Sequence, residues 1–291
     1  MKSVGILYLC TEDYYLFWNG FHESFEKNFL PDTLKRYYVF TDKPDNIHHD
    51  DNVHAYYIDP LPWPLITLLR FHYFIRFRNE ITCNDYLMFA NSNLVCRKPV
   101  SEDEFLPKDD QDLSSVLHPY YYNKPPKYCT YERNPSSSAY VPYNAEGIGY
   151  MMGGLYCGHT DKFMRMSEIL AERINEDFNN RKIALWHDES QYNRYLLEHR
   201  NVRVLTPSYA CPEGANLPFE KKIEILNKST FFNVNTFKGD SSNIKEQKQD
   251  KSGIARIFAR IIKRILRIIT PSHKTVINFY VLRDTLLGRH I

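Results

Sequence analysis

Short apolar segments bounded by polar residues alternate, through most of the chain, with longer segments whose apolar residues recur at helical spacing. The short segments predict strands at 4–10, 36–42, 53–58, 86–90, 114–117 and 203–206. The longer segments predict helices at about 17–29, 65–79, 161–179 and 186–198. Strands and helices alternate over the first hundred residues, so the pattern indicates an α/β fold with a parallel, nucleotide-binding type of sheet.

The segment at 85–96 holds the clearest candidate for a ligand site. Its apolar run at 86–90 leads directly into the polar tripeptide Asn91, Ser92 and Asn93. Ligands of open α/β sheets bind at the carboxyl ends of strands, so we expect Asn91 and Asn93 at the edge of a crevice. Side chains alternate along an extended chain, which lets both asparagines face the same side. The alternative is a strand-to-loop turn, in which asparagine is common.

The composition is that of an ordinary globular protein, with 43% hydrophobic and 25% charged residues. Six cysteines are scattered without metal-ligand spacing, which indicates a reducing compartment. No run approaches the ~20 apolar residues of a membrane-spanning helix, and the first residues lack the apolar region of a signal peptide. We therefore expect a cytoplasmic protein. No glycine-rich phosphate loop and no Ser/His/Asp signature is present.

The end of the chain differs from the rest in charge. Residues 240–291 carry 11 Lys/Arg and 4 Asp/Glu, although the whole chain has a formal charge of only +2. We interpret 239–253 as a polar linker and 254–291 as a tail that begins with a basic amphipathic helix. Such a helix suits an anionic membrane surface, which places the protein on the inner face of the cytoplasmic membrane. The alternative is a helix docked on its own domain or on a partner chain. We expect no nucleic acid, because the basic face lacks interleaved aromatic residues.

Charged residues at two predicted helix starts are candidates for chemistry. Asp188 and Glu189 are either first-turn acids that complement the helix dipole or carboxylates presented in the crevice beside Trp186. Arg70 is either solvated or turned toward the crevice. Adjacent helix residues do not face each other, so Asp188 and Glu189 make a poor glycoside-hydrolase pair. The long loop at 130–142 is of a length that is usually functional.

Several motifs occur in order along residues 3–226 and together resemble glycosyltransferase family 6. They are Tyr-Tyr-Val-Phe-Thr-Asp (37–42), the tripeptide at 91–93, Leu-His-Pro (117–119), Thr-Tyr-Glu-Arg (130–133), Ala-Tyr-Val-Pro (139–142), Gly-Gly (153–154) and Trp-His-Asp-Glu-Ser (186–190). This is the family of the blood group A and B transferases and the α1,3-galactosyltransferases. The resemblance implies a GT-A fold over 1–238, with a Rossmann-like sheet covered by helices on both faces. It also implies retaining transfer of galactose or N-acetylgalactosamine from a UDP-sugar to the 3-OH of a galactoside, in α1,3 linkage.

The resemblance further implies roles for individual residues. Glu189 matches the catalytic carboxylate on the β face of the donor sugar. The positions that match the donor and nucleotide side are Leu9, Tyr14, Arg70, Asn91, Asn93, Met152, Gly153, Gly154, Asp188, Lys221 and Lys222. The positions that match the acceptor side are His118, Thr130, Trp186 and Glu189. The acceptor implied is a galactose-terminated oligosaccharide, with or without fucose, of a blood-group-like surface glycan.

The tripeptide departs from the animal members, which have Asp-x-Asp and hold Mn²⁺ against the diphosphate; Asn91-Ser-Asn93 resembles the bacterial branch. Two neutral amides cannot offset a divalent cation as carboxylates can, although they can donate hydrogen bonds to phosphate. We therefore expect no metal and no cofactor, with the charge supplied by Arg70 and by Lys221 or Lys222. Gly154 leaves room for an N-acetyl group and favours UDP-GalNAc over UDP-Gal. The alternative function is a catalytically weak module that binds UDP-sugars or glycans.

Overall fold

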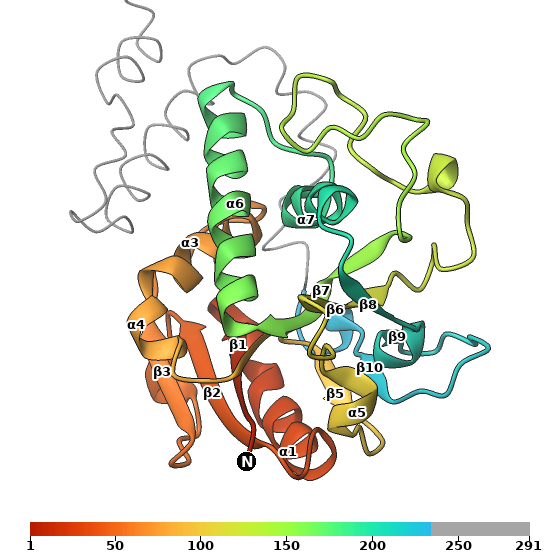
Figure 1. Ribbon diagram of the computed structural model, residues 1–291. Helices are drawn as coiled ribbons and strands as arrows, with labels where there is room; N and C mark the ends of the chain where they lie inside the picture. Colours follow the sequence, from red (N-terminus) through yellow and green to blue (C-terminus); the bar gives the residue numbers. More distant parts are fainter. Residues whose placement is uncertain (234–291) are drawn as a thin grey trace, which may run out of the picture. The chain divides into compact units, whose positions relative to one another are not determined.

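A seven-stranded sheet forms the centre of the computed structural model, which describes residues 1–233 (Figure 1). Its strands are β1 (Ser3–Leu9), β2 (Leu34–Thr41), β3 (Val53–Tyr57), β4 (Tyr86–Asn91), β6 (Leu113–Leu117), β7 (Met151–His159) and β8 (Val202–Leu205). Their order in the sheet is β3-β2-β1-β4-β7-β6-β8. The predicted linker at 239–253 and the predicted tail at 254–291 lie outside the described residues.

The parallel arrangement predicted from the sequence holds for one half of the sheet. Strands β3, β2, β1 and β4 are parallel, whereas β7 runs antiparallel to both β4 and β6. Strand β8 is again parallel to β6. The apolar pattern could not reveal the direction of β7, because its first eight residues are all buried and such a run is typical of parallel strands.

Helices cover both faces of this sheet, as the sequence predicts (Figure 1). They are α1 (Trp18–Asn28), α2 (Leu65–Leu68), α3 (Arg70–Arg76), α4 (Arg78–Ile81), α5 (Glu102–Phe105), α6 (Thr160–Asn179) and α7 (His187–Glu198). The predicted helix at 65–79 is divided into α2, α3 and α4, because ψ opens to 5° at Leu69 and to 25° at Phe77. Among the described helices, none has the length and apolar character needed to cross a membrane.

A second, small sheet continues from the end of β4. It contains β5 (Leu94–Cys96), β10 (Ile223–Ile225) and β9 (Cys211–Pro212), in the order β5-β10-β9. Strand β10 is antiparallel to β5 and aligns Ile225 with Leu94. Short 3-10 helices join the larger elements at Glu12–Phe17, Pro44–Asn46, Pro126–Tyr128, Pro207–Tyr209 and Lys228–Thr230.

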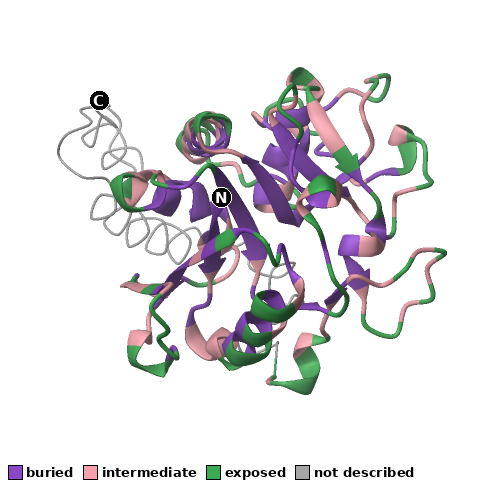
Figure 2. Cartoon of the chain, turned by 60° about the horizontal axis from the view of Figure 1, so that its bottom comes forward, coloured by how far each residue is buried: buried purple, intermediate pink, exposed green. Residues whose placement is uncertain are grey.

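Aromatic side chains fill the space between the sheet and its helices. On one face, the ring of Tyr8 in β1 lies 5.1 Å from Trp18 and 4.6 Å from Phe21 of α1, between ring centroids. On the other face, Phe163 of α6 lies 5.7 Å from Tyr156 of β7. The central strands are therefore buried along most of their length, and exposed residues gather on the outer sides of helices and in loops (Figure 2). Aromatic burial of this kind contributes most of the stability of such a core.

Candidate functional site

The carboxyl ends of β1 and β4 lie side by side, where the sequence predicts the ligand crevice. Leu9, the last residue of β1, is in register with Asn91, the last residue of β4, and both are half-buried. Gly154 of β7 lies against Asn91 from the other side: a Cβ at Gly154 would meet the Asn91 Cγ at 2.9 Å and the Met152 Cε at 2.7 Å. The structure therefore brings together Asn91, Met152 and Gly154 of the predicted donor side.

Asn93 lies just beyond this edge, in the turn that leads to the small sheet. Its Nδ2 donates to the Leu226 carbonyl at 2.7 Å, and its own carbonyl accepts from the Leu226 N–H at 2.8 Å. The side chain is buried, and its Oδ1 has no hydrogen-bond partner in the described part of the chain. A buried acceptor without a partner is costly, so this oxygen is suited to a ligand that brings a donor, such as a sugar hydroxyl.

These residues do not fit a tightly held Mn²⁺ ion. Hard divalent cations are held by oxygen ligands whose carboxylates offset the charge. Asn91 and Asn93 can offer neutral amide oxygens, and Asp188, the carboxylate predicted on the donor side, is in an ion pair with Arg70. The donor set therefore lacks the negative charge that such an ion requires.

Gly153 connects the predicted catalytic carboxylate to β7. Its N–H donates to the Glu189 Oε2 at 2.8 Å, and its carbonyl accepts from the Arg70 Nη1 at 3.1 Å. A Cβ at this position would lie 2.9 Å from the Glu189 Cβ, so only glycine allows α7 to approach the strand this closely. Burial raises the pKa of Glu189 to about 7, although the Gly153 N–H and the Tyr150 hydroxyl both stabilise its charged form.

Arg70 is buried, in contrast to the solvated alternative. Its Nη2 lies 3.2 Å from the Asp188 Oδ2, its Nε donates to the Thr67 carbonyl at 3.0 Å, and its guanidinium carbon lies 4.1 Å from the centroid of Phe89. The charge of Arg70 is thus matched within the protein by Asp188. We infer that Arg70 orders Asp188 and the Gly153 backbone, and that its charge is only partly available to a diphosphate.

Three of the four predicted acceptor residues, His118, Thr130 and Glu189, interact with Tyr150, a residue for which the sequence offers no signal. The Tyr150 hydroxyl donates to the Glu189 Oε1 at 2.8 Å, and Thr130 lowers the pKa of the same hydroxyl. The His118 ring lies 5.7 Å from the Tyr150 ring, and burial lowers the pKa of His118 to about 4. His118 is therefore neutral at pH 7. Trp186, directly before α7, is 48% exposed and offers a flat apolar surface to a sugar ring.

Tyr14 and Lys228 meet at the end of β1. Tyr14 lies in the 3-10 helix that follows this strand, and the Lys228 Nζ lies 5.0 Å from the centroid of its ring. Beside them, the Phe17 ring lies 4.2 Å from the Phe231 ring. The segment after β10 therefore packs against Tyr14, a predicted nucleotide-side residue, and brings a lysine to it.

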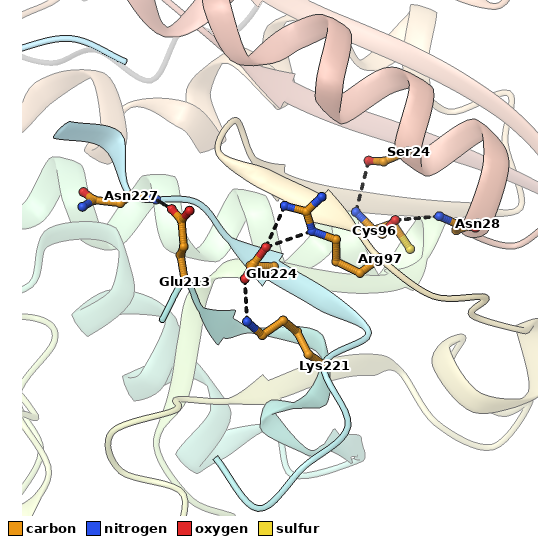
Figure 3. A network of polar contacts seen from close by, with 8 residues as sticks. All are labelled: Ser24, Asn28, Cys96, Arg97, Glu213, Lys221, Glu224 and Asn227. Carbon is orange, nitrogen blue, oxygen red and sulfur yellow. Dashed lines mark hydrogen bonds and ion pairs between the residues drawn. The ribbon is translucent and has the colours of Figure 1, made fainter. Parts of the chain in front are cut away.

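Lys221 and Lys222, the two lysines predicted on the donor side, are paired elsewhere and do not join Tyr14 and Lys228. Lys221 pairs with Glu224 at 2.6 Å, and Lys222 pairs with Glu104 at 2.7 Å (Figure 3 shows the first pair). The pairing of β10 with β5 places Lys222 beside Arg97, whereas Leu226 lies beside Asn93. Four residues of extended chain, about 14 Å, separate these two points.

Sequence patterns did not predict the roles of two groups of residues that order the site. Asn193 of α7 donates to the Met151 carbonyl and accepts from the Met151 N–H, both at 2.8 Å, and so fixes α7 on β7. Glu132 accepts from the Leu185 N–H, and Arg133 donates to the carbonyls of Val141 and Pro142. These two residues of the Thr-Tyr-Glu-Arg motif therefore hold the long loop in shape. No spacing signal reveals the bonds of Asn193 and Glu132, because their partners lie 42 and 53 residues away in the sequence.

The strand ends and the start of α7 thus bring predicted donor-side and acceptor-side residues together around the Glu189 carboxylate. The chain belongs to glycosyltransferase family 6, whose family model matches residues 2–234. Membership implies a nucleotide-sugar donor and a glycan acceptor. The match confirms the family predicted from the sequence, and the structure confirms the predicted α/β fold class.

Individual relatives come from bacteria and animals. The O-antigen biosynthesis glycosyltransferase WbnI of Escherichia coli is 34% identical over 227 residues, which cover 77% of this chain and 94% of that protein. The histo-blood group ABO system transferase 2 of Rattus norvegicus is 29% identical over 71% of this chain. The globoside alpha-1,3-N-acetylgalactosaminyltransferase 1 of Gallus gallus is 28% identical over the same share. The matched part spans 63% and 61% of these two animal proteins.

Proposed function

We propose that this glycosyltransferase moves N-acetylgalactosamine, or galactose, from a UDP-sugar to the 3-OH of a galactoside, with retention and in α1,3 linkage. The observation that carries the proposal is the setting of Glu189. Both of its carboxylate oxygens are held by protein donors at 2.8 Å, the Gly153 N–H and the Tyr150 hydroxyl. The residues of β7 on one side of it are predicted for the donor and those around Tyr150 for the acceptor, which supports a role for Glu189 where a charged transition state would form.

The acceptor class and the linkage are supported by the relatives. The name of the Escherichia coli protein assigns it to O-antigen biosynthesis, and the Gallus gallus enzyme is named as an α1,3-N-acetylgalactosaminyltransferase. We transfer both features to this chain as a proposal: the product is a blood-group-like surface glycan. Gly154 supports N-acetylgalactosamine, because a side chain there would press on Asn91 and Met152 and reduce the space for a substituent.

Departure of UDP leaves negative charge on the diphosphate, and fixed positive charge nearby stabilises it. We propose that Lys228 supplies this charge, in place of Lys221 or Lys222, because Lys228 lies over Tyr14 at the end of β1. The Asn91 amide then donates to a phosphate oxygen, and the Asn93 Oδ1 accepts from a donor hydroxyl. Transfer proceeds without a divalent metal in this scheme.

Retention requires either a covalent intermediate or attack on the same face of an ion pair. Glu189 serves both routes: as a carboxylate it can bond to the anomeric carbon while UDP leaves, or it can stabilise the positive charge of the sugar. In either route Glu189 must be ionised when the bond to UDP breaks.

The test is transfer by Glu189→Gln, with Glu198→Gln as a control. Glu198 lies at the end of the same helix and pairs with Arg173 and Arg194 away from the site. We expect Glu189→Gln to lower kcat by about 10³-fold or more, equivalent to roughly 4 kcal/mol, while UDP binding persists. The control should keep wild-type kcat. Near-normal turnover by Glu189→Gln would reject the role of Glu189, and UDP-sugar binding by the wild type without any transfer would favour the binding-module alternative.

We also propose that the tail at 254–291 holds the enzyme on the anionic inner face of the cytoplasmic membrane. The support is that apolar residues in its sequence recur at helical spacing, with basic residues about half a helical turn away. Deletion of 240–291 should release the protein from anionic vesicles while transfer to a soluble acceptor continues. Vesicle binding that survives the deletion would exclude this role.

A further inference from the structure

Tyr150 is a buried phenol in direct contact with the predicted catalytic carboxylate. It directly precedes β7 and is 1% exposed. Its ring packs edge-on against Tyr121 and Tyr131, with centroids 5.2 and 5.0 Å away. This aromatic cluster fixes the hydroxyl in one place, 2.8 Å from the Glu189 Oε1. The geometry gives the oxygen little freedom, since the ring cannot move without displacing its neighbours.

Four groups influence the protonation of the Glu189 carboxylate, from three separate parts of the fold. The Gly153 N–H and the Tyr150 hydroxyl donate to it from β7 and the residue before β7. Asp188 on its own helix disfavours the charged form, and Arg70 on α3 favours it, but these two residues are paired with each other. The two donors are therefore the main interactions that favour a carboxylate over a carboxylic acid in a buried position.

We propose that Tyr150 is a positioning residue of the transfer reaction: its hydroxyl fixes the direction of the Glu189 Oε1 and favours the carboxylate over the carboxylic acid. This inference rests on the proposed role of Glu189. Thr130 lowers the pKa of the same hydroxyl, and the Tyr150 ring contacts His118, so the residue connects the predicted acceptor side to the carboxylate. A ligand on the predicted acceptor side would therefore influence Glu189 through the Tyr150 side chain.

The direction of the expected change in the pKa of Glu189 follows from the loss of the Tyr150 hydroxyl as a hydrogen-bond donor. A phenolic O–H bonds more strongly to a carboxylate than to a protonated carboxyl, so its removal favours the protonated form and raises the pKa of Glu189. A hydrogen bond to a charged group corresponds to a shift of about one pKa unit or slightly more. Burial raises the pKa of Glu189 to about 7 in the wild type. Removal of the Tyr150 hydroxyl therefore changes the protonation of Glu189 within the pH range in which activity is measured.

The experiment compares Tyr150→Phe with Tyr131→Phe. Tyr131 belongs to the same aromatic cluster, and its hydroxyl donates to the Gly149 carbonyl at 3.2 Å instead of to Glu189. The Glu189 carboxyl carbon is titrated by ¹³C NMR in protein labelled at glutamate, with Glu189→Gln to assign the signal. Tyr150→Phe should raise the pKa by about one unit, and the acid limb of kcat against pH should move upward equally. Tyr131→Phe should change neither.

The NMR titration requires no substrate, so it tests Tyr150 even if the proposed transfer reaction fails. An unchanged pKa in folded Tyr150→Phe, or equal shifts in both variants, would overturn the inference. If Tyr150→Phe does not fold, 3-fluorotyrosine is placed at position 150 alone. This more acidic phenol donates more strongly and has nearly the same shape, so it should lower the pKa of Glu189. A pKa that rises or stays constant with the fluorinated residue would equally reject the role.

Discussion

Gly153→Ala should show whether the position of Glu189, the proposed catalytic carboxylate, can be disturbed without loss of the fold. The new Cβ would lie 2.9 Å from the Glu189 Cβ and 3.2 Å from its Cα. Carbon atoms in contact prefer 3.5–4.0 Å, so the start of α7 must retreat by about 0.5–1 Å. A misplacement of about 1 Å can cost 10²-fold in rate. We therefore expect kcat to fall about 100-fold, equivalent to about 2.7 kcal/mol in the activation free energy.

The assay measures kcat at saturating donor and acceptor, UDP affinity by calorimetry and Tm by thermal melting. Gly20→Ala is the matched control, because a Cβ at Gly20 in α1 meets no atom within 4 Å. This control should keep full activity and gain about 0.5–1 kcal/mol of stability from the helix propensity of alanine. If Gly153→Ala folds and turns over within a few-fold of wild type, the close contact of β7 and α7 does not position the carboxylate.

Three further substitutions test other parts of the site. Gly154→Ala should lower kcat/KM for UDP-GalNAc at least tenfold more than for UDP-Gal in a competition assay, and equal losses would contradict the assigned donor choice. Asn193→Ala should lower the free energy of unfolding in urea by about 2 kcal/mol or more, because it leaves the buried Met151 N–H and carbonyl without a partner. Lys228→Ala should weaken UDP binding about tenfold by calorimetry, whereas Lys222→Ala should not; the reverse result would restore the position first expected from the sequence.

Most of the helices and strands could be predicted from the sequence alone, because their apolar residues recur at regular spacing. Apolar runs located all strands of the central sheet except β7, and the rule that ligands bind at carboxyl strand ends predicted where the site lies. Leu9 and Asn91 do lie side by side at that edge. These predictions succeed because burial and strand ends depend on local pattern, which is visible along the chain.

The positions of the cations could not be predicted, because they depend on pairing between distant segments. Which end of β10 reaches the site is decided by its antiparallel pairing with β5, more than 120 residues earlier. That pairing brings Leu226 to Asn93 and leaves Lys222 with Glu104. The burial of Arg70 follows from a similar cause, since its carboxylate partner lies on α7.

Tyr150 and Asn193 give no sequence signal for a different reason. Tyr150 acts through its hydroxyl and Asn193 through its side-chain amide, on partners about 40 residues away on another element. A tyrosine among 22 and an asparagine within a helix are both ordinary residues by composition. Their importance becomes visible only when the atoms that they contact are known.

The most direct measurement follows the transfer reaction by ¹H NMR in excess EDTA, with UDP-GalNAc and a galactoside acceptor. It reports the rate, the anomeric configuration and the linkage of the product together. We expect the wild type to form an α1,3-linked product at an undiminished rate in the chelator, and Glu189→Gln to form almost none while still binding UDP. A β-linked product, or activity that disappears in EDTA and returns with Mn²⁺, would contradict the account.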